Sequence, residues 1–232
     1  MRLVGLFMFL AISALGTLPG CTGLRGAAAD PGPAARPSAG WQAEMAGFAA
    51  ADRAAPPAAD AVVFTGSSSV RMWDSLAHDF PGVPVINRGF GGSQVRDATW
   101  HADALVVRYR PRRILLYAGD NDIDAGRTPA QVLHDVQAFV ARIRRDLPRV
   151  PIVYVAIKPS PARLHQLPMQ RQANAAIRRW APTVPMVAFA DVATPMLDAR
   201  GQPRAELFLA DRLHMNASGY AVWQAALLPY VR

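Results

Sequence analysis

Residues 62–71 read Val-Val-Phe-Thr-Gly-Ser-Ser-Ser-Val-Arg. The apolar run predicts a short buried strand, Gly66 predicts a turn, and the serines that follow predict the start of a helix. A serine at such a place lifts its hydroxyl off the end of the strand and lies beside open backbone N–H groups, which suits a nucleophile whose oxyanion must then be held. The same serine would also make a good helix cap, so this stretch by itself allows both roles.

Near the other end of the chain, Asp211-Arg212-Leu213-His214 precedes the last predicted helix. A serine hydroxyl is a poor nucleophile near neutral pH unless a base takes its proton, and histidine is the side chain best suited to that task. An acidic residue beside the histidine would fix its tautomer and orientation. This segment could alternatively do no more than cap the helix.

From residue 61 onward, continuous apolar runs alternate with amphipathic runs. Apolar runs without an alternating pattern are typical of parallel strands that helices cover on both faces. We therefore predict an α/β fold, a three-layer α/β/α sandwich with a parallel five-stranded sheet. The expected strands are 61–65, 83–87, 113–118, 152–157 and 185–190, and the expected helices are 41–55, 93–110, 128–147, 169–180 and 216–231.

Four polar segments fall where this pattern places the carboxyl ends of the strands, the edge at which such sheets bind their ligands. They are residues 66–69, 87–92, 119–122 and 211–214. Each of them alone could be a glycine turn or a helix cap. Their occurrence together at one edge favours a catalytic site.

With these four segments in the same order and at similar spacings, the chain resembles the SGNH hydrolase superfamily, also called GDSL esterases and lipases. The resemblance covers about residues 60–232. It implies a flavodoxin-like α/β/α sandwich, in agreement with the strand pattern. It also implies hydrolysis of esters, and of some amides, of lipids, carbohydrates and small acyl donors.

The resemblance assigns a nucleophile, a base and an acid. The family's Gly-Asp-Ser signature falls on Gly66-Ser67-Ser68, so Ser68 would be the nucleophile, although Ser67 replaces the signature aspartate. Three serines in a row leave Ser67 and Ser69 as alternatives. The family's Asp-x-x-His pattern falls on Asp211 and His214, so His214 would take the proton from Ser68 and Asp211 would orient the imidazole.

The oxyanion hole implied by the resemblance has three donors, the backbone N–H groups of Ser68 and Gly92 and the side-chain amide of Asn121. Gly92 ends the family's second block, with Gly91 as the alternative. Asn121 occupies the asparagine of the family's Gly-x-Asn-Asp pattern. A glycine is useful beside an oxyanion because no Cβ hinders close approach of the backbone.

The order serine, aspartate, histidine also occurs in α/β-hydrolases. Their nucleophile elbow, Gly-x-Ser-x-Gly, would need a second glycine where this chain has Val70. The sequence therefore disfavours the α/β-hydrolase fold.

The first 40 residues read as a targeting segment and a tether. An apolar run over 3–15 has the length of a signal peptide, and Leu18-Pro19-Gly20-Cys21 resembles a bacterial lipoprotein signal, from which Pro19 departs. We expect a signal over 1–20, a lipid on Cys21, a flexible tether over 21–40 and the hydrolase domain over 41–232. The protein would then be anchored to the membrane in the cell envelope, facing the periplasm. A plain secretory signal would make it a secreted protein instead.

The chain carries a formal net charge of +8, and Lys158 is its only lysine. The arginines are scattered, without zinc-finger spacing or aromatic residues interleaved with basic ones, so nucleic acid is not an expected partner. Cys21 is the single cysteine, which excludes an internal disulfide. The remaining histidines lack metal-ligand spacing, and we expect neither a metal nor a cofactor.

Residues beside the four segments are candidates for the pocket wall, namely Arg88, Phe90, Lys158, Met215 and, in the loop after the fourth strand, His165. Arg88 could instead pair with Asp120 or Asp122. The expected partner is an ester of a small molecule, glycan or lipid. Two other functions stay open, an acyltransferase that moves acetyl groups onto envelope glycans with the same site, and a non-catalytic envelope binding protein.

Overall fold

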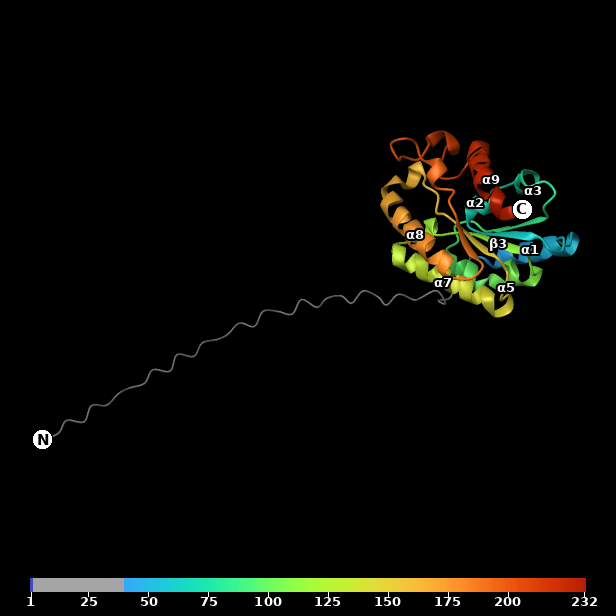
Figure 1. Ribbon diagram of the computed structural model, residues 1–232, viewed down its shortest axis with the longest axis horizontal. Coiled ribbons are helices and arrows are strands. Elements are labelled where there is room, and N and C mark those ends of the chain that lie inside the picture. Colours follow the sequence, from blue (N-terminus) through green and yellow to red (C-terminus); the bar gives the residue numbers. More distant parts are fainter. Residues whose placement is uncertain (2–39) are drawn as a thin grey trace. The chain divides into compact units, whose positions relative to one another are not determined.

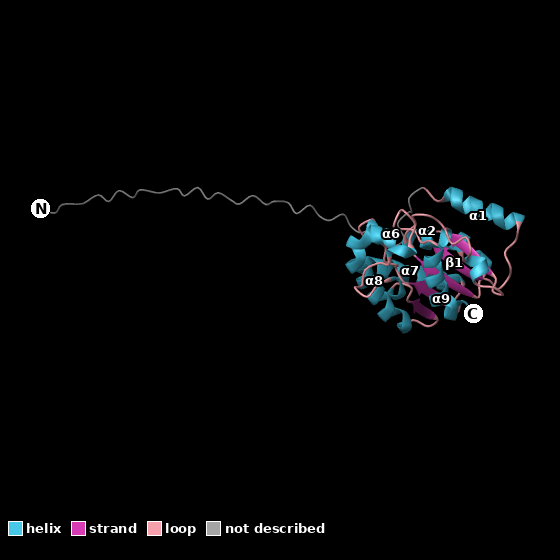
Figure 2. Ribbon diagram, turned by 90° about the horizontal axis from the view of Figure 1, so that it is seen from above, coloured by secondary structure: helices cyan, strands magenta, loops and turns pink. Residues whose placement is uncertain are grey.

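A parallel five-stranded sheet in the order β2-β1-β3-β4-β5 forms the middle layer of the domain, as predicted (Figures 1 and 2). The computed structural model describes Met1 and residues 40–232, so the expected signal, Cys21 and residues 22–39 of the tether lie outside the described residues. The strands are β1 (Val62–Gly66), β2 (Val85–Gly89), β3 (Arg113–Tyr117), β4 (Ile152–Val155) and β5 (Val187–Ala190).

Helices cover both faces of this sheet. One face carries α1 (Gln42–Ala54), α4 (Val95–Trp100), α5 (Ala102–Leu105), α7 (Pro129–Asp146) and α8 (Leu167–Trp180), and the other carries α2 (Ser68–Arg71), α3 (Leu76–Asp79) and α9 (Ala217–Val231). The short α6 (Asp120–Asp124) follows β3. Short 3-10 helices span Val107–Tyr109, Pro161–Gln166, Ala181–Thr183, Thr194–Met196 and Ala205–Leu207. Within residues 40–232, no helix is long and apolar enough to cross a membrane.

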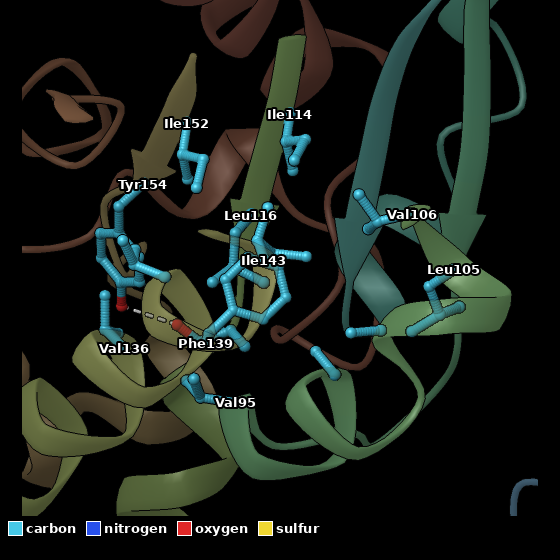
Figure 3. Close-up of a cluster of buried hydrophobic side chains, with 14 of the residues drawn as sticks. Val95, Leu105, Val106, Ile114, Leu116, Val136, Phe139, Ile143, Ile152 and Tyr154 are labelled. Atoms are coloured by element: carbon cyan, nitrogen blue, oxygen red, sulfur yellow. Dashed lines mark hydrogen bonds between the residues drawn. The ribbon is translucent and has the colours of Figure 1, made fainter. Parts of the chain in front are cut away.

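The core consists of two apolar layers, one on each side of the sheet. Alternate side chains of a strand point to opposite faces, so Ile114 and Leu116 enter one layer while Leu115 enters the other. In the first layer, Phe139 and Val136 of α7 lie against the sheet residues (Figure 3). These residues have almost no exposed surface, and burial of such side chains is the main stabilising term of the fold.

Local signals in the sequence set the start of the longest helix, α7. Thr128 caps its N-terminus by accepting a hydrogen bond from the Gln131 N–H, while the Gln131 side chain accepts from the Thr128 N–H, and Pro129 takes the first helical position.

The prediction of a single helix over 93–110 was wrong in one respect. The backbone leaves helical geometry at His101 (φ −91°, ψ 15°), which separates α4 from α5 beside the poor helix formers Thr99 and Trp100.

Glycines allow the elements at the carboxyl edge of the sheet to approach closely. Gly66 has φ +125°, and a Cβ added to it would lie 1.7 Å from the carbonyl oxygen of Tyr117 on β3. A Cβ at Gly89 would lie 2.1 Å from the backbone nitrogen of Arg71. No other residue fits either position, and α2 can therefore begin directly above the ends of β1 and β2.

We predict that Gly66→Ala lowers the free energy of unfolding by about 2–5 kcal/mol, because it combines a strained φ with an overlap that only backbone movement relieves. Gly47→Ala is the matched control, since a Cβ at Gly47 in α1 would meet nothing within 4 Å. It should raise stability by about 0.5–1 kcal/mol through helix propensity. Urea unfolding followed by circular dichroism measures both, and equal effects of the two variants would contradict the prediction.

Candidate active site

Of the three consecutive serines, Ser68 alone lines a cleft. Ser67 is fully buried and Ser69 is 2% exposed, whereas Ser68 is partly exposed at the first position of α2. The Ser68 Oγ lies 3.0 Å from the Nε2 of His214. Geometry therefore favours Ser68 over its two neighbours as the reactive hydroxyl.

His214 and Asp211 form the rest of a hydrogen-bonded series. The His214 Nδ1 lies 2.6 Å from Asp211 Oδ2, while Asp211 Oδ1 accepts the backbone N–H groups of Leu213 and His214, each at 2.9 Å. Desolvation acts to raise the pKa of Asp211, but these bonds from the His214 ring and from the backbone outweigh it and lower that pKa from 3.8 to about 2. The carboxylate is thus ionised near neutral pH and can accept a hydrogen bond from the Nδ1–H of His214.

Gly92 and Asn121 lie on the cleft wall with Ser68 and His214. Within residues 40–232, the backbone N–H groups of Ser68 and Gly92 donate to no backbone carbonyl in the turns and loops. The Nδ2 of Asn121 donates to the Ser93 carbonyl at 3.0 Å and keeps a second hydrogen. The structure thus brings all five predicted site residues to one place, with three donors beside the Ser68–His214 pair.

The cleft has a volume of about 410 Å³ and a mostly polar wall. It is lined by Glu44, Ser68, Arg71, Gly91, Gly92, Asn121, Arg163, Leu213 and His214.

The sequence model of the GDSL-like Lipase/Acylhydrolase family matches residues 38–222. The chain belongs to this family. A search of curated protein sequences found no match. Solved structures give the same fold for this family member. One, provisionally described as a platelet activating factor from Streptococcus pneumonia, is 22% identical with a TM-score of 0.71 and covers 81% of this chain and 91% of its own.

Two further structural neighbours carry names of esterases or lipases. A GDSL-like lipase from Bacteroides thetaiotaomicron is 18% identical with a TM-score of 0.69, covering 82% of this chain and 97% of its own. A mutant of an acetyl-xylooligosaccharide esterase from Geobacillus stearmophilus is 14% identical with a TM-score of 0.59, covering 75% and 95%. At these identities the likeness is one of fold.

Three cleft residues of this family member were not predicted. Arg163 lies in the loop after β4, at the same sheet edge as the four polar segments. From the sequence, that loop could have been recognised as a fifth polar segment at this edge. Arg71 lies one turn after Ser68 in α2. Glu44 comes from α1, which precedes the first strand, and no local signal marks it as a cleft residue.

Arg88 was expected in the pocket wall, with a pairing to Asp120 or Asp122 as the alternative, and both expectations were wrong. Arg88 forms an ion pair with Asp52 of α1 and donates from Nε to the hydroxyl of Tyr109 at 2.8 Å. The Tyr109 hydroxyl in turn donates to Asp52 at 2.6 Å. Since Arg88 is buried and turned toward α1, it fastens that helix and does not line the cleft.

The other proposed wall residues also lie outside the cleft. Phe90 is fully buried and packs edge-on against Trp41 at 5.5 Å between ring centroids, and His165 is exposed away from the cleft. Met215 lines an adjoining pocket of about 460 Å³ that shares Arg71 with the cleft. Lys158 is 1% exposed and supports the wall from behind, where its Nζ donates to the Leu213 carbonyl at 2.8 Å. Burial lowers the pKa of Lys158 to about 8.

Asp122, at the end of the third polar segment, is bonded to the first residue of α4. Its Oδ1 accepts the N–H of Val95 at 3.0 Å, while its Oδ2 has no hydrogen-bond partner among residues 40–232. Burial raises the pKa of Asp122 to about 7, with the charges of Asp135 and Asp120 adding to the effect. Between about pH 4 and pH 7, Asp122 is therefore protonated in the folded state and ionised in the unfolded chain.

We predict that Asp122→Asn reduces the loss of stability between pH 5 and pH 8. The folded pKa lies above the unfolded value, so the stabilising contribution is complete below about pH 4 and is lost as pH rises through about 7. Asparagine keeps an acceptor for the Val95 N–H but does not titrate. Urea unfolding at both pH values measures the difference. An Asp122→Asn variant with the same pH dependence of stability as the parent would contradict this account. The control is Asp146→Asn, which replaces an exposed carboxylate.

Proposed function

We propose that this chain is a serine ester hydrolase that works through an acyl-enzyme on Ser68. The observation that carries the proposal is the hydrogen-bonded series from Ser68 through His214 to Asp211, which joins positions 146 residues apart. Within the family, this arrangement supplies a nucleophile, a base and an acid that orients the base.

In the first half of the reaction, Ser68 Oγ attacks the ester carbonyl carbon while His214 Nε2 takes the hydroxyl proton. The carbonyl oxygen becomes an oxyanion that accepts hydrogen bonds from the N–H groups of Ser68 and Gly92 and from the Asn121 Nδ2. The C–O bond to the alcohol then breaks, and His214 returns the proton to the leaving oxygen. The products of this half are a free alcohol and the acyl ester of Ser68.

In the second half, a water molecule gives a proton to His214 and its oxygen attacks the acyl-enzyme carbonyl. The same donors hold the second oxyanion. The bond to Ser68 Oγ breaks, His214 returns the proton to that oxygen, and the carboxylic acid leaves. Asp211 stays ionised throughout, consistent with its low pKa, and stabilises the imidazolium that forms in each half.

The residues that line the cleft favour an ester substrate with a small acyl group and a polar alcohol. Charged side chains of Glu44, Arg71 and Arg163 reach the cleft, whereas Leu213 is its one large apolar lining residue among those described. A long acyl chain would find little apolar surface there, and each buried methylene would otherwise add about 0.8 kcal/mol. An acetylated or other short-chain ester of a hydroxyl-rich alcohol fits these surroundings better.

We predict that a fluorophosphonate labels the parent enzyme and fails to label Ser68→Ala, which also loses esterase activity. Ser67→Ala is the matched control, because the Ser67 hydroxyl is buried without a hydrogen-bond partner among the described residues. It should keep labelling and rate within about threefold, since it removes no donor or nucleophile. In-gel fluorescence and p-nitrophenyl acetate hydrolysis measure the two readouts. Labelling that persists in Ser68→Ala would move the nucleophile elsewhere, and a folded parent without either readout would favour a binding protein.

We further predict that kcat/KM for p-nitrophenyl esters does not rise from acetate to octanoate. An apolar acyl pocket would raise it by roughly fourfold for each methylene that becomes buried. Steady-state rates across the acyl series, below the critical micelle concentration of the longer esters, provide the measurement. An increase of tenfold or more toward octanoate would show an acyl channel and reject the small-acyl proposal.

A further inference from the structure

The guanidinium of Arg163 lies against Asn121 from the loop that follows β4. Its Nη2 donates to the Asn121 Oδ1 at 3.0 Å. The same guanidinium forms ion pairs with Asp120 at 3.3 Å and with Asp124 at 3.2 Å. The side chain of Arg163 is 13% exposed, so these contacts are largely shielded from bulk water.

These contacts decide which way the Asn121 amide faces. A guanidinium can only donate hydrogen bonds and a backbone carbonyl can only accept them. Arg163 must therefore face the amide oxygen, and the Ser93 carbonyl must face the amide nitrogen, as observed. One hydrogen of Nδ2 is used by Ser93 and the other is left for the cleft. An amide turned by 180° would present an oxygen to the developing oxyanion and repel it.

The charge of Arg163 also strengthens the donor that Asn121 offers. A cation on the amide oxygen polarises the amide, and hydrogen bonds in series reinforce one another. The two carboxylates keep the guanidinium plane in place, and Asp124 is itself held by the Nε2 of Gln166 at 2.6 Å. The result is a connected set of polar contacts that ends at the oxyanion-facing hydrogen of Asn121.

We propose that Arg163 is the positioning residue of the oxyanion hole, fixing the orientation of the Asn121 amide and polarising it through the amide oxygen. This role rests on the oxyanion-binding function proposed for Asn121. Arg163 acts through Asn121, and its effect falls on the transition state more than on substrate binding.

Arginine suits this position better than lysine. The planar guanidinium reaches Asn121, Asp120 and Asp124 at once. An ammonium is a point charge with no fixed fork, and one such group cannot hold three acceptors in this arrangement. Arg163→Lys therefore keeps the charge and loses part of the orientation, which makes it the milder of two test variants.

The first experiment measures kcat and KM for p-nitrophenyl acetate. Arg163→Met should lower kcat by about 10- to 100-fold, less than complete loss of an oxyanion donor, with KM changed by no more than about twofold. Arg163→Lys should fall between that variant and the parent. The matched control is Arg171→Met, which removes an arginine bonded to the Gly201 carbonyl, away from the cleft, and should leave kcat unchanged. A kcat for Arg163→Met within twofold of the parent would overturn the proposal.

A double-mutant cycle separates positioning from a general structural role. If Arg163 acts through Asn121, then adding Arg163→Met to Asn121→Ala should change kcat by less than about twofold, because coupled residues are not additive. Losses that multiply would overturn the proposal, since they would show that Arg163 acts independently of Asn121. Thermal unfolding shows whether each variant folds. If Arg163→Met does not fold, Arg163→Lys takes its place in the double-mutant cycle.

A second readout does not depend on turnover. In protein labelled with 15N-asparagine, the side-chain amide pair of Asn121 is assigned by its absence from Asn121→Ala. Arg163→Met should shift or broaden that pair, and Arg171→Met should not. An unchanged Asn121 pair in Arg163→Met would overturn the proposal even if the chain hydrolyses no ester. A shifted pair in a chain without esterase activity would uphold the contact and reject the proposed function alone.

Discussion

Close approach of the backbone at the carboxyl edge of the sheet is the constraint on which the site depends. At Gly66 and Gly89 there is no room for a Cβ beside β3 and α2. The parallel register brings Gly66 level with Gly89 on one side and with Tyr117 on the other, so three strands end together. Because α2 starts immediately above this edge, Ser68 is lifted to the cleft and the segments after β2 and β3 lie beside it.

The two sides of the cleft are held by different sets of contacts. On one side, Asp211 closes a tight turn by accepting two backbone N–H groups, and buried Lys158 holds the Leu213 carbonyl from below. On the other side, Asn121 is fixed between Ser93 and Arg163. Both sets fix polar groups before a substrate arrives, and preorganised donors lower the cost of charge development in a transition state. The loop after β4 supplies Lys158 and Arg163 and thus supports both sides.

The N-terminal helix α1 adds a wall that the sheet itself does not provide. Asp52 fastens it to Arg88, and Trp41 packs on Phe90, with its Cη2 3.5 Å from the position of a Cβ on Gly92. Glu44 of the same helix reaches the cleft. The wall of the cleft is therefore made by side chains of α1 and α2 as well as by the loops at the carboxyl edge of the sheet.

The sequence by itself determined the α/β class, the five strands within a few residues, and the four polar segments that meet at the cleft, because continuous apolar runs and glycine-rich polar turns are local signals. Only the tertiary structure decided which serine of 67–69 faces the cleft, that Arg88 pairs with Asp52, and that Arg163 holds Asn121. These outcomes depend on which distant side chains meet after packing. A long arginine can reach any acceptor that the fold brings near, and its position in the chain does not specify which one.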